Sequence, residues 1–334
     1  MKILYLGNKL SKHGINKTTV ETLGENLSQS GFTVVSYSSK KNSVLRILDM
    51  LFGILKHKNA DYILIDTYST SAFWFAFFTS QLARILNMKY VPILHGGNLP
   101  DRLISHPKCC KMVFNNAFTN VSPSEYLKFH FENFGISNVI CIPNSINVSE
   151  YPFKERQIFT PNILWVRAFA TIYNPKMAVD VLSLLQEKYP SATLTMVGPD
   201  KDGSLEITKN YANQFNLKVN FTGKLSKEEW TDVAKKHDIF INTTHFDNTP
   251  VSVLEAMALG LPVVSTNVGG LPFLISHQKN GYLVNDTNAS EMAEQIEKII
   301  KFPNQAIEII GNAKNMISTM DWRVVKKQWS NLLG

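Results

Sequence analysis

The chain alternates between short apolar runs and longer segments with helical periodicity, and this alternation constrains its fold more than any other feature. A short run that is apolar throughout is typical of a strand buried on both faces, as in a parallel sheet. The first series of expected strands comprises 2–7, 33–37, 62–66, 90–95 and 139–143. A second series comprises 162–166, 193–198, 219–223, 238–243, 261–266 and 281–284. The sequence therefore predicts two parallel α/β units in succession.

The length of the chain and one polar segment predict where it divides. With 334 residues the chain exceeds what one hydrophobic core normally serves, so we expect two domains of about 150 residues each. The strand and helix patterns lapse over 144–161, where prolines interrupt a polar segment. We therefore expect an N-terminal domain over 1–155 and a C-terminal domain over 156–318. An amphipathic helix is predicted over 319–334.

The cysteines and the first residues of the chain indicate which cellular compartment to expect for the protein. The three cysteines, Cys109, Cys110 and Cys141, have neither metal-ligand spacing nor an even disulfide framework, which favours a reducing compartment. Residues 1–7 enter a short apolar strand and lack the longer apolar region and cleavage site of a signal peptide. We therefore expect a cytoplasmic protein that holds no metal.

Net charge and hydropathy limit the classes of partner. The chain has 34 Lys and Arg against 27 Asp and Glu, a net charge of +7 spread without a long basic run. This excess suits phosphorylated substrates or an anionic membrane surface and gives no support for nucleic acid. The most apolar stretch, 71–86, falls short of the roughly 20 apolar residues of a membrane span. We expect a buried helix there.

The segment 246–270 contains the clearest indication of a binding site. Asp247 lies in a polar loop after an expected strand, Pro250 suits a first helical turn, and Gly260 would end the helix. A helix that starts after a strand presents backbone N–H groups and the positive end of its dipole to an anion. The sequence predicts a diphosphate site formed by Asn248, Thr249, Pro250, Val251 and Ser252.

Glu255 lies between Leu254 and Ala256 in the otherwise apolar helix. A carboxylate in such a position needs a partner. A ribose diol is one candidate, and a Lys or Arg from a neighbouring element is the other. Asp247, taken alone, is equally compatible with a loop or helix-cap role.

The pattern from Asp247 onward resembles that of a known family. An acid, seven residues and a glutamate are followed by Ala-Met-Ala-x-Gly-Leu-Pro-Val-Val and a Gly-Gly pair, as in the retaining glycosyltransferases of family 4. The resemblance implies the GT-B fold, an α/β architecture of two facing Rossmann-like domains with parallel sheets. In that fold the last helix crosses back to the first domain. Ligands of parallel sheets bind beyond the carboxyl ends of the strands, here in the cleft between domains.

The resemblance also implies residue roles. Asp247 would contact hydroxyls of the donor sugar and Glu255 the ribose, although the family usually has Glu at the first position. Arg167, at the end of an expected strand, would hold the donor diphosphate through its fork of donors. Many members have a Lys five residues later, where this chain has Ile172. Lys176 is the candidate substitute, with a solvated surface side chain as the alternative.

Further candidates are carried over from loops that follow other strands. Gly198 and Gly223 would allow close approach of the nucleotide, with ordinary strand-end turns as the alternative. Lys224 would reach phosphate. In the first half, Gly14 would belong to a loop that closes on the donor, and His95 would lie near the reacting carbon. The alternative for His95 is a purely structural side chain.

One tripeptide has the spacing of a metal-binding motif. Asp200-Lys-Asp202 spells the Asp-x-Asp of another glycosyltransferase fold, but its position in a turn of the second unit favours a plain loop. Arg167, the lysines and the helix N-terminus would stabilise a departing diphosphate without a metal. No cofactor beyond the donor substrate is expected.

The resulting prediction is a retaining, metal-independent glycosyltransferase that uses a nucleotide-diphosphate sugar, in glycan or polysaccharide biosynthesis. A GT-B-fold sugar-nucleotide epimerase and a non-catalytic nucleotide-sugar or glycan-binding module are the alternatives. A dehydrogenase is disfavoured because no Gly-x-Gly-x-x-Gly follows the first strand. The expected acceptor is a glycan or lipid-linked glycan. Peripheral contact of 71–86 with the inner membrane surface would suit the latter, and buried packing is the alternative explanation for its aromatics.

Overall fold

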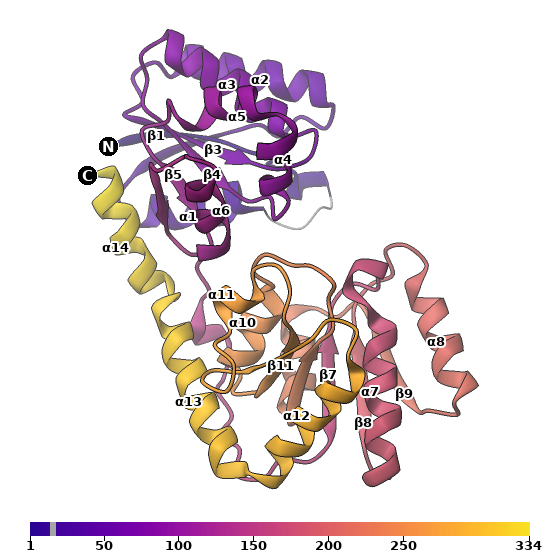
Figure 1. Ribbon diagram of the computed structural model, residues 1–334. Coiled ribbons are helices and arrows are strands. Elements are labelled where there is room, and N and C mark those ends of the chain that lie inside the picture. The colour runs from indigo at the N-terminus through magenta and orange to yellow at the C-terminus, as the bar shows by residue number, and fades with distance from the viewer. Residues whose placement is uncertain (14–17) are drawn as a thin grey trace. The chain divides into compact units, whose positions relative to one another are not determined.

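The computed structural model describes residues 1–13 and 18–334, which form two compact units (Figure 1). The first unit comprises 1–144 together with 322–334, and the second comprises 145–321. Each unit contains one six-stranded sheet in which every pair of neighbouring strands is parallel. The predicted α/β fold class with two parallel sheets is therefore confirmed.

The first sheet has the strand order β2-β1-β3-β4-β5-β6. Its strands are β1 (Lys2–Leu6), β2 (Thr33–Tyr37), β3 (Tyr62–Thr67), β4 (Tyr90–Leu94), β5 (Asn120–Ser122) and β6 (Val139–Cys141). Its helices are α1 (Thr19–Gln29), α2 (Ser43–Lys56), α3 (Phe73–Ile85), α4 (Leu99–Ser105), α5 (Pro107–Phe114), α6 (Glu125–Asn133) and α14 (Trp322–Leu333). The sequence did not predict β5, because three residues with a polar first position carry no strand pattern.

Helices cover both faces of this sheet. On one face, side chains of α1 and α14 pack with those of β1 and β3 in a single apolar cluster that includes Val325, Trp329 and Leu333. On the other face, Met50 and Ile54 of α2 and the alanines of α3 pack on the same strands. The last helix of the chain therefore completes the core of the first unit, as the predicted fold class requires.

The second sheet has the strand order β12-β11-β10-β7-β8-β9. Its strands are β7 (Asn162–Val166), β8 (Thr193–Val197), β9 (Val219–Gly223), β10 (Ile239–Asn242), β11 (Val263–Thr266) and β12 (Tyr282–Val284). Its helices are α7 (Pro175–Lys188), α8 (Ser204–Gln214), α9 (Lys227–Lys235), α10 (Val251–Ala258), α11 (Leu271–Leu274), α12 (Ala289–Lys301) and α13 (Pro303–Thr319). Each of these six strands corresponds to a run predicted from the sequence.

The boundary between the two units lies earlier in the chain than the expected position, 155/156. Ile146 and Tyr151 are buried in a core cluster of the second unit. The backbone N–H of Ile146 donates to the carbonyl of Met320 at 3.0 Å, which joins the two ends of this unit. Units therefore change after Asn144 and after Asp321. The sequence pattern placed the change later because this segment is extended and carries no helical or strand period.

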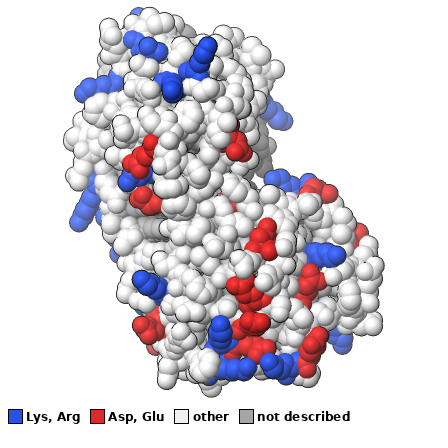
Figure 2. All heavy atoms as spheres, in the orientation of Figure 1, with Lys and Arg blue, Asp and Glu red and all other residues white. Residues whose placement is uncertain are grey.

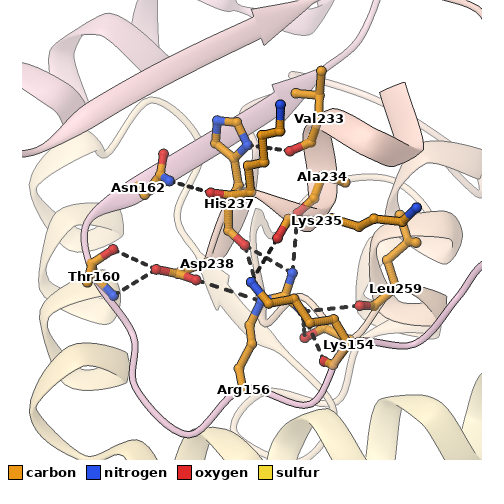
Figure 3. Close-up of polar contacts among 12 residues, drawn as sticks. Lys154, Arg156, Thr160, Asn162, Val233, Ala234, Lys235, His237, Asp238 and Leu259 are labelled. Atoms are coloured by element: carbon orange, nitrogen blue, oxygen red, sulfur yellow. Dashed lines mark hydrogen bonds and ion pairs between the residues drawn. The ribbon is translucent and has the colours of Figure 1, made fainter. Parts of the chain in front are cut away.

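Arg156 holds the segment before β7 on the second unit (Figure 3). Its guanidinium is buried and donates to five backbone carbonyls, at 2.7 to 3.2 Å. The carbonyls belong to Lys154, Ala234, His237, Leu259 and Gly260. Four of them follow or end α9 and α10, so a positive charge meets the negative ends of two helix dipoles.

None of the helices formed by the described residues combines the length and the apolar character needed to cross a membrane.

Candidate functional site

Two glycines fix the backbone at the predicted binding loop of the second unit. A Cβ on Gly270 would lie 1.9 Å from the carbonyl oxygen of Asn248, and one on Gly269 would lie 2.2 Å from that of Asp247. The backbone N–H of Gly270 also donates to the Asp247 carbonyl, at 2.8 Å. The Gly-Gly pair is required because larger residues would displace the loop that carries Asp247.

Arg167 and Asp247 form an ion pair in which Nη2 contacts Oδ2. Arg167 follows β7 and Asp247 follows β10, and these strands are neighbours in the sheet. The two side chains are 18% and 16% exposed, so the pair is largely shielded yet reaches solvent. The sequence predicted different parts of one ligand for these residues, and the sheet topology brings them into contact.

The remaining surroundings of Arg167 leave donor capacity unused. Its guanidinium carbon lies 4.4 Å from the centre of the Tyr173 ring. Its Nε is buried and has no hydrogen-bond partner among the described residues. Burial lowers the pKa of Arg167, and Tyr173 partly opposes that shift. A buried donor without a partner carries a free-energy cost that an anionic ligand would relieve.

The start of α10 has the features of an anion site. Pro250 is the N-cap, with φ −68°, and no side chain caps the helix in the described part of the chain. The Ser252 hydroxyl, in the first turn, is buried and lacks a partner among the described residues. Val251 is 54% exposed, which shows that the first turn reaches the surface. Backbone N–H groups and one hydroxyl are thus available to a ligand.

Glu255 has a partner that the sequence did not predict. The phenol of Tyr151 donates to its Oε1 at 2.5 Å. Burial raises the pKa of Glu255, while the Tyr151 hydrogen bond and the charge of Lys227 partly oppose this shift. Lys227 lies over the Tyr151 ring at 4.4 Å and pairs with Glu150. The protein group that contacts the carboxylate is therefore a neutral donor, and not the Lys or Arg considered as the alternative to a ribose diol.

Tyr151 was not predicted, because it lies in the segment 144–161, where the strand and helix patterns lapse. Its core position depends on the second unit beginning at Ser145. No signal in the sequence separates Tyr151 from Phe153 and Phe159, the other aromatic residues of this segment.

The glycines predicted to approach the nucleotide differ in their surroundings. A Cβ on Gly198 would lie 1.8 Å from the Arg167 carbonyl oxygen, so this glycine is required by packing against Arg167. Its N–H donates to the Gly223 carbonyl at 2.9 Å. Gly223 has φ +73° and open space where a Cβ would stand. Gly223 thus leaves room for a ligand, whereas the space beside Gly198 is filled by backbone.

The two predicted lysines differ as well. Lys224 is exposed, next to Gly223. The ammonium of Lys176, in the first turn of α7, lies 4.0 Å from the centre of the Tyr211 ring on α8. The Lys176 side chain is therefore engaged with α8.

The Asp-x-Asp motif forms a turn, as interpreted. Asp202 accepts hydrogen bonds from Thr171 and Ser204, which lower its pKa to about 2. Asp200 accepts from the backbone of Gly203 at 3.1 Å. Across the described residues no group of His, Cys, Asp and Glu has the arrangement of a metal site.

His95, in the first unit, belongs to a buried polar cluster. Its Nε2 lies 2.8 Å from Oδ1 of Asp66, and the Tyr5 phenol donates to the same oxygen at 2.9 Å. The Asp66 carboxylate is fully buried, and its Oδ2 has no partner among the described residues. Because a carboxylate oxygen can only accept a hydrogen bond, Nε2 of His95 is the nitrogen that carries a proton. In the neutral ring, Nδ1 is then the nitrogen without one.

Asp66 and Tyr5 were not singled out from the sequence, since each looked like an ordinary strand residue. Gly96, after His95, packs closely, with a Cβ position 2.4 Å from the Ser69 backbone nitrogen. Protein backbone, rather than space for a ligand, explains this glycine. Gly14, the other predicted residue of the first unit, lies outside the described residues.

Residues 152–316 match the family model of glycosyl transferases group 1. This segment, 165 of the 334 residues, is therefore similar to the group 1 glycosyltransferases. It contains Arg167, Asp247, Glu255 and the Gly-Gly pair, whereas Tyr151 directly precedes it. The partner of Glu255 is thus contributed by the residue next to the matched glycosyltransferase segment.

Curated relatives share part of their length with the chain. An uncharacterized glycosyltransferase of Haemophilus influenzae is 25% identical over 60% of this chain and 57% of its own. Glycogen synthase of Mycobacterium tuberculosis is 23% identical over 57% of this chain and 47% of its own. The chain spans about half the length of these two relatives.

Solved structures resemble the chain over nearly its whole length. HepE of Anabaena in complex with UDP and glucose has a TM-score of 0.76 at 18% identity, covering 100% of this chain and 99% of HepE. Sucrose-phosphate synthase of Thermosynechococcus elongatus has a TM-score of 0.79 at 15% identity, with coverages of 99% and 98%. These likenesses confirm the predicted GT-B fold.

Proposed function

We propose that the protein is a glycosyltransferase that moves a sugar from a nucleotide-diphosphate sugar to an acceptor hydroxyl in glycan or polysaccharide biosynthesis. The observation that carries this proposal is the contact between Arg167 and Asp247 beside the open start of α10. The cation proposed for phosphate, the acid proposed for the sugar and a helix N-terminus all follow the carboxyl ends of neighbouring strands. Glu255, on the same helix, supplies a ribose ligand.

The donor diphosphate would be held by Arg167 and by the start of α10. Arg167 has a buried, unpartnered Nε, and Ser252 a buried, unpartnered hydroxyl, within the described chain. Both are donors, and a diphosphate offers several acceptor oxygens. Lys224 is exposed beside Gly223 and would add a second cation, whereas Lys176 would first have to leave the Tyr211 ring.

The reaction breaks the bond between the anomeric carbon and the diphosphate oxygen and forms one between that carbon and the acceptor oxygen. The departing diphosphate takes up negative charge, which Arg167 and the helix dipole stabilise. We propose a retaining, metal-independent route in which the acceptor's proton passes to the departing phosphate oxygen on the same face of the sugar. Asp247 would orient the sugar hydroxyls, and His95 is the candidate sugar contact from the first unit.

The proposed acceptor is a glycan or lipid-linked glycan. HepE was solved with UDP and glucose, and a TarM variant with fondaparinux, α-GlcNAc-glycerol and UDP, which supports UDP sugars as first donors to test. A lipid-linked acceptor would bring the protein to the cytoplasmic face of a membrane. Both the location and the membrane contact stay predictions.

A donor screen followed by a transfer assay tests this function. Thermal shift against UDP, GDP, ADP and CDP sugars should single out one nucleotide, since a ligand specific to the folded state raises apparent stability. Arg167→Ala and Glu255→Ala should each lose transfer, whereas Arg84→Ala and Glu206→Ala, exposed matched controls, should keep it. Full activity in both site variants would refute the assignment.

The same assay without acceptor separates the alternatives. Conversion of the donor into another sugar nucleotide would indicate an epimerase. Donor binding without transfer or hydrolysis, tested over a panel of glycan acceptors, would indicate a binding module.

A further inference from the structure

Helix α2 presents an apolar face to solvent. Five large apolar side chains on it are 48% to 65% exposed: Val44, Leu45, Leu48, Phe52 and Leu55. Their spacing places them on one side of the helix, where a surface helix normally carries polar residues. Single exposed apolar residues are ordinary, but a continuous row of this kind marks a surface that meets another apolar phase.

The charges of α2 do not interrupt this row. Arg46 is buried, and its guanidinium donates to the carbonyls of Lys40 and Lys41 and to the side chain of Asn8. Asp49 accepts a hydrogen bond from the Ser38 hydroxyl at 2.5 Å. Both charged groups in the body of the helix are therefore engaged within the first unit, and its solvent side is left apolar.

Neighbouring helices extend the apolar surface. Helix α3 lies beside α2, and α5 lies beside α3 (Figure 1). Phe78 and Ile85 of α3 are 48% and 77% exposed, and Met112 of α5 is 42% exposed. The other aromatics of 71–86 contribute little to this surface, because Phe73 is buried and Trp74, Phe75 and Phe77 are half-buried, in line with the buried helix expected there. The row on α2 is thus the larger part of the surface.

Exposed lysines frame α2 at both ends. Lys40 and Lys41 precede the helix, Lys56 is its last residue, and Lys58 follows shortly after. None of the four pairs with a carboxylate in the part of the chain that the structure describes. Figure 2 shows Lys and Arg without Asp or Glu over the part of the first unit where α2 and α3 lie.

We propose that the α2 surface, meaning the five apolar residues and the four flanking lysines, docks on an anionic lipid bilayer. Apolar side chains of an interfacial helix enter the boundary between headgroups and acyl chains, and nearby lysines pair with anionic headgroups. The observed arrangement, an apolar row with cations at its ends, matches both requirements. The surface lies outside the residues proposed to bind the donor, so the inference goes beyond the transfer reaction.

A second copy of the chain fits this surface less well. If two α2 helices paired through their apolar rows, lysines of one copy would face lysines of the other in either orientation. Only Asp49 between residues 40 and 58 is acidic, and it is already hydrogen-bonded to Ser38. Like charges at an interface disfavour self-association, whereas anionic lipids neutralise them.

Vesicle co-sedimentation of the full chain tests the proposal. The protein should bind vesicles containing phosphatidylglycerol and bind vesicles of pure phosphatidylcholine far more weakly. Leu48→Gln combined with Phe52→Gln should lower binding about tenfold or more, because half-exposed apolar groups no longer enter the bilayer. Lys40→Glu combined with Lys41→Glu should lower it similarly and make it insensitive to salt.

Matched controls lie on other surfaces. Lys326→Glu with Lys327→Glu makes the same charge change on exposed positions of α14, which covers the opposite face of the first sheet. Val324→Gln with Ile207→Gln removes two exposed apolar side chains elsewhere. These controls should bind as the unchanged protein does, and thermal melting should show all variants folded.

Three results would overturn the proposal. They are no vesicle binding by the unchanged protein, equal losses in the α2 and control variants, and a concentration-dependent dimer that the α2 substitutions abolish while vesicle binding persists. Donor binding, measured alongside, reports separately on the proposed function.

Discussion

The guanidinium of Arg167 pairs directly with the carboxylate of Asp247, at a position that is largely buried but still reaches solvent. In the pair, one arm of the guanidinium is used and Nε has no partner among the described residues. A bound diphosphate would occupy unused donors without breaking the pair. The contact therefore couples the residue proposed for phosphate to the residue proposed for the sugar.

Arg167→Lys should lower kcat/KM by about 100-fold, because a single ammonium cannot serve phosphate and Asp247 with the geometry of a planar fork. Arg167→Ala should cost at least as much and should leave Asp247 without its cation. Steady-state kinetics with the donor found in the screen would measure both. If Arg167→Lys kept full activity, bidentate binding by Arg167 would be wrong.

Asp247→Glu should change donor choice more than total activity. The longer side chain moves the carboxylate outward by one methylene while its charge is kept for Arg167. Competition between sugars that share one nucleotide would report the change in preference. An unchanged order of preference, together with unchanged kcat/KM, would show that Asp247 does not contact the sugar.

Glu255→Gln should stabilise the ligand-free protein at neutral pH and abolish ribose recognition. Burial raises the pKa of Glu255 in the folded protein above the ordinary value of 4.5, so the folded state binds more protons than the unfolded state between these two values. Stability should therefore fall as pH rises through that window, and the amide should remove this dependence. Thermal melting from about pH 4 to about pH 8, compared between the unchanged protein and Glu255→Gln, would measure it.

Tyr151→Phe is the companion variant. It removes the hydrogen bond to Glu255 but keeps the ring under Lys227. Stability at neutral pH should drop by about 1 to 3 kcal/mol, since a buried carboxylate loses its donor. In the Glu255→Gln background the same change should cost less, and equal costs in both backgrounds would contradict a Tyr151–Glu255 interaction.

The spacing of apolar residues along the chain explains which parts of the fold could be predicted from the sequence. Five strands of the second sheet are largely buried, and each was found because burial on both faces favours a run of apolar residues. Strand β9 was also found, although none of its residues is buried. Strand β5 carries no apolar run, since it is three residues long and begins with Asn120. The early change of unit at Ser145 was equally hidden, because it depends on contacts with residues near Met320 that are distant in the chain.

The residues of the candidate site also divide into those that the sequence could predict and those that it could not. Residues with a family pattern, such as Asp247 and Glu255, were found by spacing, whereas their partners come from elements far away in sequence. Tyr151 and Asp66 reach Glu255 and His95 only because the sheets and core bring them there. Glycine roles were mixed, since Gly198 and Gly96 serve close backbone packing. Charge and chemistry can be predicted locally, but partners require the tertiary structure.

Arg156→Ala should destabilise the protein by about 3 kcal/mol or more, because five carbonyls lose a buried donor at once. Arg156→Lys should recover little, since an ammonium cannot span two helix ends. Urea denaturation would measure both, with the exposed Arg84→Ala as the control for loss of an arginine. A loss as small as that of the control would show that water replaces Arg156 at the two helix ends.

Asp66→Asn should lower the rate of transfer about tenfold or more without weakening donor binding. The carboxylate accepts a hydrogen bond from His95 Nε2 and another from the Tyr5 phenol on the same oxygen. An amide would turn its oxygen to these two donors, so it would keep the hydrogen bonds but lose the negative charge that stabilises a protonated imidazole. Tyr5→Phe removes only the hydrogen bond that the Tyr5 phenol donates to Asp66, so it should lower kcat much less than Asp66→Asn does.

A structural role for Asp66 would lower the melting temperature but leave the pH profile of kcat unchanged, whereas a positioning role moves that profile. An unchanged profile in a well-folded Asp66→Asn variant would therefore remove Asp66 from the proposed mechanism.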